Sequence, residues 1–310
     1  MYPDSAMKKN LFYFVFFVAF ASLFFVACGN TDQGAVSGVQ GAGAISEDHG
    51  GNFASDDSAN ETKVPLTSYS VPILMYHYIR DYTDPNDQIG IGLSVSPKTF
   101  EDQLRWLKEN YYESVSMDYL LGAYKLKGTK PIILTFDDGY QDAYDQAFPL
   151  LVKYGFQATF YVIVDKVGTG GYLTWNEILK MSEAGMNFGS HTLSHPDLRN
   201  LSEDLLMKEL RESKGILEEK LSGGGGGGDG ASAGGVLYGG SDGASAWSLH
   251  VTNFCYPSGK YNSKAIEVLK KLGYKTAVTT HSGIANEKTD IFELPRIRVT
   301  NGTKLESFLR

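Results

Sequence analysis

One stretch, residues 131–144, reads P-I-I-L-T-F-D-D-G-Y-Q-D-A-Y and constrains the fold of this chain more than any other. Its apolar residues run directly into two adjacent carboxylates, Asp137 and Asp138, and a glycine. A short apolar run bounded by Pro and Gly is typical of a strand buried on both faces, as in a parallel sheet. Such sheets carry their reactive groups at the carboxyl ends of the strands. The sequence therefore predicts a buried strand that ends in a chemically active carboxylate pair.

Two neighbouring carboxylates repel each other, so keeping both ionised requires a cation or hydrogen-bond donors close by, unless one takes up a proton. A bound metal ion meets this requirement. The alternative is a solvated D-D-G turn, because Asp and Gly are also common turn residues.

A second motif favours the metal. Residues 190–198 read S-H-T-L-S-H-P-D-L, follow a strand-like stretch, and hold two of the six histidines in the chain. If this segment turns helically, His191 and His195 lie on one face and can bind one borderline metal such as zinc. Cobalt, manganese and nickel are the alternatives to zinc.

Together, T-F-D-D-G-Y and S-H-T-L-S-H-P-D-L resemble the polysaccharide deacetylases, carbohydrate esterases of family four that share the chitooligosaccharide-deacetylase homology domain. Three further runs resemble the same family in the same order: V-P-I-L-M-Y-H-Y-I at 71–79, F-C-Y-P-S-G-K-Y-N at 254–262 and L-P-R-I-R-V at 294–299. The resemblance covers residues 71–299, and its motifs are specific in combination.

Strand-like and helical patterns alternate along this region, which predicts an α/β fold with a parallel sheet or barrel. The expected strands are 71–76, 131–136, 157–163, 186–190, 251–256, 274–280 and 294–299. A first helix is expected to begin at Ser96-Pro97, and four more are expected at 142–154, 174–184, 202–220 and 262–272. The pattern alone does not separate an open sheet from a closed barrel. The family resemblance implies a distorted (β/α) barrel.

The resemblance also implies roles for individual residues. Asp138, His191 and His195 correspond to the metal ligands and Asp137 to the general base, while the backbone N–H of Tyr256 would contribute to the oxyanion hole. A site with one carboxylate and two histidines leaves positions open for water and a substrate carbonyl, which agrees with these roles.

The chain departs from the family at two places. Many members carry an arginine two residues before the proline of the 254–259 motif, where this chain has Cys255. Arg296 or Arg298 could substitute, although a Leu-Pro-Arg stretch is more often a solvated strand edge. The chain also lacks the late L-x-H pattern that supplies a histidine in family members.

The general acid must then come from elsewhere in the chain. His77 directly follows the apolar strand at 71–76, so a closed barrel would bring it to the same face as Asp137. This placement resembles the rearranged motif order of deacetylases that act on bacterial exopolysaccharides. A structural histidine, with His281 as the acid, is the alternative. Tyr140 and Tyr261 adjoin motifs and could stack on sugar rings, although aromatic residues near strand ends are mostly core.

The composition and the ends of the chain define its setting. A formal charge of −8 argues against nucleic acid as a partner. Residues 1–28 contain Lys8-Lys9, an apolar run and A-C-G, which predicts a lipoprotein-type signal with lipid on Cys28; an uncleaved signal anchor is the alternative. Residues 29–67 are expected to be a flexible tether, and 68–310 a catalytic domain with a Gly-rich insertion at 222–246. The protein is thus expected to be exported and anchored on a membrane, facing the periplasm or the cell exterior.

These observations lead to one main functional expectation: metal-dependent removal of N-acetyl groups from N-acetylglucosamine units of an envelope or extracellular glycan, including peptidoglycan. An O-acetyl esterase of the xylan type would use the same residues. A catalytically inactive glycan-binding lipoprotein is the alternative that is not an enzyme.

Overall fold

The computed structural model describes residues 70–123, 125–223 and 250–309. The predicted signal at 1–28, the predicted tether at 29–67 and nearly all of the Gly-rich segment at 222–246 lie outside these residues, so they stay predictions. Among the described residues, no helix combines the length and the apolar character that crossing a membrane requires.

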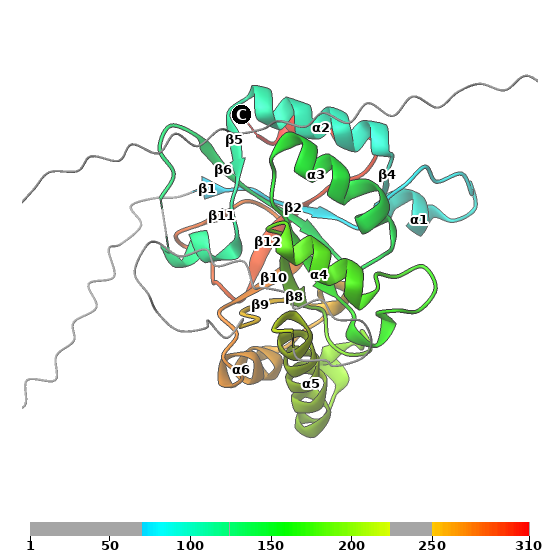
Figure 1. Cartoon of the computed structure of the whole chain (residues 1–310). Helices are drawn as coiled ribbons and strands as arrows, with labels where there is room; N and C mark the ends of the chain where they lie inside the picture. Colours follow the sequence, from blue (N-terminus) through cyan, green and yellow to red (C-terminus); the bar gives the residue numbers. More distant parts are fainter. Residues whose placement is uncertain (1–69, 124, 224–249, 310) are drawn as a thin grey trace, which may run out of the picture. The chain divides into compact units, whose positions relative to one another are not determined.

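The centre of the fold is a sheet of eight parallel strands that closes on itself (Figure 1). The strands follow the order β2-β12-β10-β9-β8-β7-β6, and β6 pairs back with β2. The closed ring therefore contains every strand of this sheet except β5, which pairs with the start of β6. The strands are β2 (Ile73–Tyr76), β5 (Tyr112–Ser114), β6 (Lys130–Phe136), β7 (Thr159–Val162), β8 (Asn187–Ser190), β9 (Asn253–Cys255), β10 (Thr276–Ser282) and β12 (Leu294–Arg298).

Two short strand pairs lie outside this sheet. β1 (Ser70–Val71) pairs antiparallel with β11 (Ala285–Asn286), and β3 (Tyr78–Ile79) pairs parallel with β4 (Ser94–Val95). The helices surround the barrel (Figure 1). They are α1 (Gln88–Leu93), α2 (Pro97–Glu109), α3 (Phe148–Tyr154), α4 (Trp175–Glu183), α5 (Glu203–Leu221) and α6 (Ser263–Lys271).

Local sequence signals set the helix starts. The Ser96 side chain accepts a hydrogen bond from the Thr99 amide, and Pro97 occupies the first helical position of α2. Thr174 and Glu177 form a reciprocal capping box at the start of α4. These caps satisfy amides that have no partner within the helix, which explains why the sequence-based helix boundaries agree closely with the structure.

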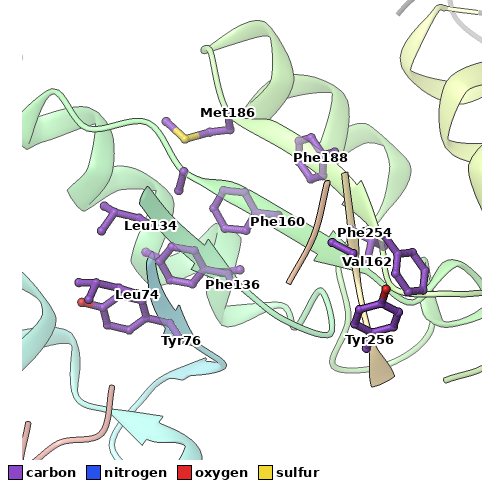
Figure 2. Close-up of a cluster of buried hydrophobic side chains, with 14 of the residues drawn as sticks. Leu74, Tyr76, Leu134, Phe136, Phe160, Val162, Met186, Phe188, Phe254 and Tyr256 are labelled. Atoms are coloured by element: carbon purple, nitrogen blue, oxygen red, sulfur yellow. The ribbon is translucent and has the colours of Figure 1, made fainter. Parts of the chain in front are cut away.

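Side chains on successive strand positions alternate between the two faces of the barrel wall, and each face has its own buried cluster. The interior cluster includes Ile73, Ile133, Tyr161, Cys255, Val278 and Leu294. The outer cluster packs under the helices and contains the aromatic residues of Figure 2. Phe136 stacks on Tyr76 and Phe160 with ring centroids 5.1 and 4.8 Å apart. Each such pair adds about 0.5–1.5 kcal/mol beyond burial.

The stacked aromatic residues also determine where the site lies along the barrel axis. Tyr76, Phe136 and Phe160 are register partners on β2, β6 and β7. The residues that follow Tyr76 and Phe136, His77 and Asp137, therefore emerge together at the carboxyl end of the barrel.

The closed barrel confirms the fold that the resemblance implied, and the expected strands and helices are present. The helix expected at 142–154 is divided into a π-helical turn, Ala143–Ala147, and α3. The sequence patterns missed α1, β5 and the short β3–β4 pair, which are too short to show periodicity.

Candidate metal centre

The candidate site lies where β6 and β8 end. Asp137 and Asp138 directly follow β6, and His191 directly follows β8. Asp138 adopts a left-handed backbone conformation with φ 73°, and Gly139 continues it with φ 77°. A non-glycine residue in this region costs about 1–3 kcal/mol and is often found at functional sites.

Asp138, His191 and His195 converge on one point. Oδ1 of Asp138 lies 3.3 Å from Nε2 of His191 and 3.7 Å from Nε2 of His195. Their ligand atoms all lie within 4.8 Å of one another, and the carboxylate is buried. This geometry fits a divalent cation and brings together the three residues that the sequence predicted as metal ligands.

The opposite side of the His191 ring fixes its orientation. Nδ1 of His191 lies 2.7 Å from the carbonyl oxygen of Cys255. Because a carbonyl only accepts, Nδ1 carries the proton and donates it, which leaves the Nε2 lone pair directed toward Asp138. The donor set of two imidazoles and one carboxylate suits zinc and similar borderline metals.

The expectation that a helical turn brings the two histidines together is wrong. The segment after β8 is irregular, and Thr192 and His195 have φ values of 68° and 63°. The Thr192 hydroxyl accepts a hydrogen bond of 2.9 Å from the His195 amide. The two histidines are therefore brought together by a left-handed backbone at Thr192, which this hydrogen bond stabilises, and not by a helical turn.

Asp137 lies next to this cluster, within 4.8 Å of a ring nitrogen of His191, and is paired with Arg296. Two nitrogens of the guanidinium donate to the two carboxylate oxygens, each at 2.7 Å. Arg296 is fully buried and also donates to the Thr279 carbonyl at 2.8 Å and to the Thr135 hydroxyl at 3.0 Å. Both oxygens of the Asp137 carboxylate thus accept from the same guanidinium, which fixes the orientation of the carboxylate.

Arg296 answers the question that Cys255 raised in the sequence. The Cys255 thiol is buried, 3.3 Å from Nη2 of Arg296 and 3.5 Å from Oδ2 of Asp137. A guanidinium from β12 thus lies beside the small residue of β9, while Arg298 is exposed. The solvated-edge interpretation is wrong for Arg296, because its side chain lies on the interior face of β12, the same face as Leu294, and is fully buried there.

Electrostatics keep both carboxylates ionised. Burial alone would raise the pKa of Asp137, but the charge and hydrogen bonds of Arg296 outweigh it and hold that pKa well below its usual range. Burial also acts to raise the pKa of Asp138, but the neighbouring imidazoles of His191 and His77 together outweigh it and lower that pKa. The opposite charges that adjacent carboxylates require are therefore present.

His77 lies beside Asp137, as expected. Its Nε2 lies 3.8 Å from Oδ2 of Asp137, and its side chain is 12% exposed. Burial lowers the pKa of His77, although Asp137 and Asp138 act in the opposite direction. The structure thus places a histidine beside Asp137; its role as an acid stays a prediction.

The oxyanion-hole role expected for the backbone N–H of Tyr256 stays a prediction. Its backbone N–H donates to the Val278 carbonyl at 3.2 Å as part of the β9–β10 pairing. Its hydroxyl donates to the Phe292 carbonyl at 3.0 Å, and the side chain is fully buried. The backbone strain lies further on, at Ser258 with φ 52°. A motif shows which strand ends near the metal cluster, but it does not show which backbone amides are hydrogen-bonded within the sheet.

Comparison with known proteins agrees with this geometry. The sequence model of the family described as polysaccharide deacetylase matches residues 125–224. YxkH of Bacillus subtilis (strain 168), which carries a polysaccharide deacetylase name, is 30% identical over 77% of this chain and 74% of its own length. The poly-β-1,6-N-acetyl-D-glucosamine N-deacetylase of Staphylococcus epidermidis is 27% identical over 78% of this chain and 84% of its own.

A solved structure shows the same likeness. The Streptococcus pyogenes deacetylase PplD, solved in complex with acetate, is 32% identical and superimposes with a TM-score of 0.65. The match covers 78% of this chain and 98% of that one.

Proposed function

Because the chain belongs to the polysaccharide deacetylase family, we propose that it hydrolyses N-acetyl groups of N-acetylglucosamine units in an envelope or extracellular glycan, releasing acetate. One observation carries this proposal: the Asp138–His191–His195 cluster lies beside a carboxylate, Asp137, that Arg296 keeps ionised. A metal position and a separate base are the two parts that amide hydrolysis requires.

Asp138, His191 and His195 would hold the metal, with zinc favoured by the two imidazoles and cobalt, manganese or nickel as alternatives. When bound, the metal would polarise the acetyl carbonyl and lower the pKa of the attacking water. Asp137 is the general base. It is ionised, and both of its oxygens accept hydrogen bonds from Arg296, which fix its orientation.

The proton balance assigns a role to His77. Asp137 takes one proton from the attacking water, the C–N bond breaks, and the leaving nitrogen must receive a proton because an amide anion is a very poor leaving group. His77 supplies that proton. With 3.8 Å between Nε2 of His77 and Oδ2 of Asp137, the proton held by the base can return to His77 and restore both groups.

An amide substrate is supported over an ester by the relatives. The S. epidermidis protein is named for removing N-acetyl groups from poly-β-1,6-N-acetyl-D-glucosamine. Nothing in the cleft residues themselves excludes an O-acetyl ester, because the same base and metal would cleave it.

The experiment that tests this proposal is acetate release from a panel of glycans. The panel comprises chitooligomers, β-1,6-linked N-acetylglucosamine oligomers, peptidoglycan and acetylated xylan, each with and without a chelator. We expect chelator-sensitive release from an N-acetylated member, and none from Asp137→Asn. Release from xylan alone would identify an O-acetyl esterase, and binding without release would identify a glycan-binding protein.

We also propose that the protein is exported and tethered to a membrane through lipid on Cys28, facing the periplasm or the cell exterior. The Lys-Lys pair, the apolar run and A-C-G support this location. A tether of the length of residues 29–67 would let the catalytic domain reach envelope glycan.

A further inference from the structure

Three tyrosines form a continuous aromatic row at the carboxyl end of the barrel, close in sequence to the candidate metal centre. The ring centroids of Tyr78 and Tyr140 are 4.3 Å apart, and those of Tyr140 and Tyr172 are 5.0 Å apart. All three side chains are only half-buried. We call Tyr78, Tyr140 and Tyr172 the tyrosine ladder.

The ladder is held rigidly at both ends. The guanidinium of Arg80 lies 4.0 Å from the centroid of the Tyr78 ring, and Arg80 is itself paired with the buried Asp142. At the other end, two backbone hydrogen bonds of 2.9 Å, from Gln141 to Gly171 and from Leu173 to Gly139, join the Tyr172 loop to the turn after β6. The rings therefore stay in place without a ligand.

The ladder adjoins the candidate metal centre through the chain itself. Tyr78 directly follows His77, and Tyr140 lies two residues after Asp138. The pairing of Tyr76 with Phe136 brings these two segments out of the barrel side by side. A polymer bound with one of its units at the metal centre would thus extend along or across the ladder.

Structural packing does not account for the ladder. None of its three tyrosines belongs to either hydrophobic cluster of the described residues, whereas Tyr144, on the following turn, packs against the outer one. Tyr261, the other aromatic residue that adjoins a motif, also packs there, stacks on Tyr256 at 4.0 Å and donates its hydroxyl to Glu293. The ladder thus combines partial exposure with a position outside both clusters.

We propose that the tyrosine ladder is a subsite for the sugar rings that neighbour the N-acetylated unit at the metal centre. Tyrosine offers an apolar ring and a hydroxyl, which match the C–H face and the hydroxyls of a pyranose. Rings that are already fixed lose little entropy when they bind, so they contribute affinity efficiently. This inference rests on the proposed function, which identifies the bound polymer as a glycan.

The test separates the ladder from the metal centre by using substrates with and without a chain. Tyr172→Ala removes the one ladder ring that does not lie within two positions of a proposed metal ligand or of His77, and Tyr140→Phe removes a hydroxyl but keeps the ring. KM and kcat are measured on N-acetylglucosamine oligomers of increasing length, and the rate is measured on an aryl acetate, which has no sugar. Tyr154→Ala is the matched control, because Tyr154 is half-buried on α3 and bonds to Glu101.

We expect Tyr172→Ala to raise KM for longer oligomers about tenfold, with kcat, metal content and aryl acetate hydrolysis unchanged. Tyr140→Phe should raise KM in the same direction, and Tyr154→Ala should match wild type. A KM for both ladder variants equal to that of wild type would overturn the inference. A parallel loss on oligomers and aryl acetate would also overturn it, because that pattern indicates damage to the metal centre.

A second measurement keeps this outcome distinct from failure of the proposed function. Calorimetric titration with deacetylated oligomers measures chain binding without turnover. If wild type releases no acetate from any glycan, the proposed function fails; weaker binding of the oligomer by Tyr172→Ala would still support the ladder. Equal binding by wild type and Tyr172→Ala, or none by either, would overturn it.

Discussion

The guanidinium of Arg296 binds the carboxylate of Asp137 through two hydrogen bonds of 2.7 Å, although 159 positions separate the two residues in the sequence. Both side chains are buried within the barrel, so neither charge has water to replace its partner. Removing one partner of such a pair costs about 3–5 kcal/mol because the other is left buried and uncompensated. The pair thus links the last strand of the barrel to the candidate base.

This pair predicts a shift in the pH dependence of activity. Arg296 lowers the pKa of Asp137, against burial that acts to raise it. Arg296→Lys keeps a charge but loses the bidentate geometry, so the pKa of Asp137 should rise and the acidic limb of the pH–rate profile should move to higher pH. Arg298→Lys, at the exposed end of β12, is the control and should leave the profile unchanged. An acidic limb in Arg296→Lys that coincides with that of wild type would refute the proposed coupling.

The same reasoning extends to stability. Asp137 has a depressed pKa in the folded state, so its stabilising effect is present above its unfolded pKa and is lost as pH falls through the folded value. Arg296→Met removes the partner and should lower the free energy of unfolding at neutral pH by about 3–5 kcal/mol. The double variant Arg296→Met with Asp137→Leu should recover part of this loss, because no buried charge remains. Chemical denaturation of the single and double variants checks this; a double variant no more stable than the single one would contradict it.

The three proposed metal ligands predict a specific loss of metal. His191→Ala and His195→Ala should each lose bound metal and turnover, since each removes one of the three converging donors. His281→Ala is the matched control, because His281 is exposed at the end of β10 and outside the cluster. Elemental analysis after dialysis measures the metal, and circular dichroism checks folding. A folded His191→Ala, His195→Ala double variant that still binds one equivalent tightly would show that the assignment is wrong.

The sequence patterns located the strand ends but not the geometry between them. Asp137, Asp138 and His191 were placed correctly, because an apolar run ending in polar residues shows where a buried strand stops. Arg296 could not be assigned from sequence, because its contact with Asp137 depends on ring closure and on which face of β12 it occupies. The hydrogen bond from the Tyr256 amide to the Val278 carbonyl could not be read from sequence either, because it depends on how the strands pair.

Backbone strain escaped sequence reasoning altogether. His191 and His195 were predicted to meet on a helical face, yet they meet through left-handed residues. No local propensity favours that conformation for Thr192, so only the surrounding structure can hold it there. Only Tyr140 of the tyrosine ladder was singled out from sequence, because the three members come from separate segments: β3, the turn after β6 and the loop before α4.

The lipid anchor is tested by labelling. If Cys28 is the acylated residue, radiolabelled fatty acid should be incorporated into the wild type and not into Cys28→Ser. The other cysteine supplies the control, because Cys255 is buried in the barrel and Cys255→Ser should retain the label. Equal labelling of wild type and Cys28→Ser would remove the lipoprotein interpretation and leave the signal anchor.

His77 provides the last prediction, because amide cleavage requires an acid that protonates the leaving nitrogen. His77→Ala should keep its metal, since His77 lies outside the ligand cluster, and should lose about 10²–10⁴-fold in turnover, the usual contribution of one acid–base group. The acid must be protonated to act, so the wild-type rate should fall as pH rises through its pKa, and His77→Ala should lack this alkaline limb. Burial lowers the pKa of His77, which moves the limb below the position that an exposed histidine would give.

The competing acid is His281, which is exposed beside Tyr261, with ring centroids 6.3 Å apart. An aryl acetate separates the two roles further, because its leaving group departs without protonation and its hydrolysis should survive His77→Ala. A His77→Ala enzyme near the wild-type rate on an N-acetylated oligomer, together with an inactive His281→Ala, would transfer the role to His281. If His77→Ala retains its metal but loses activity on both substrates, His77 instead serves to orient Asp137, whose Oδ2 lies 3.8 Å from its Nε2.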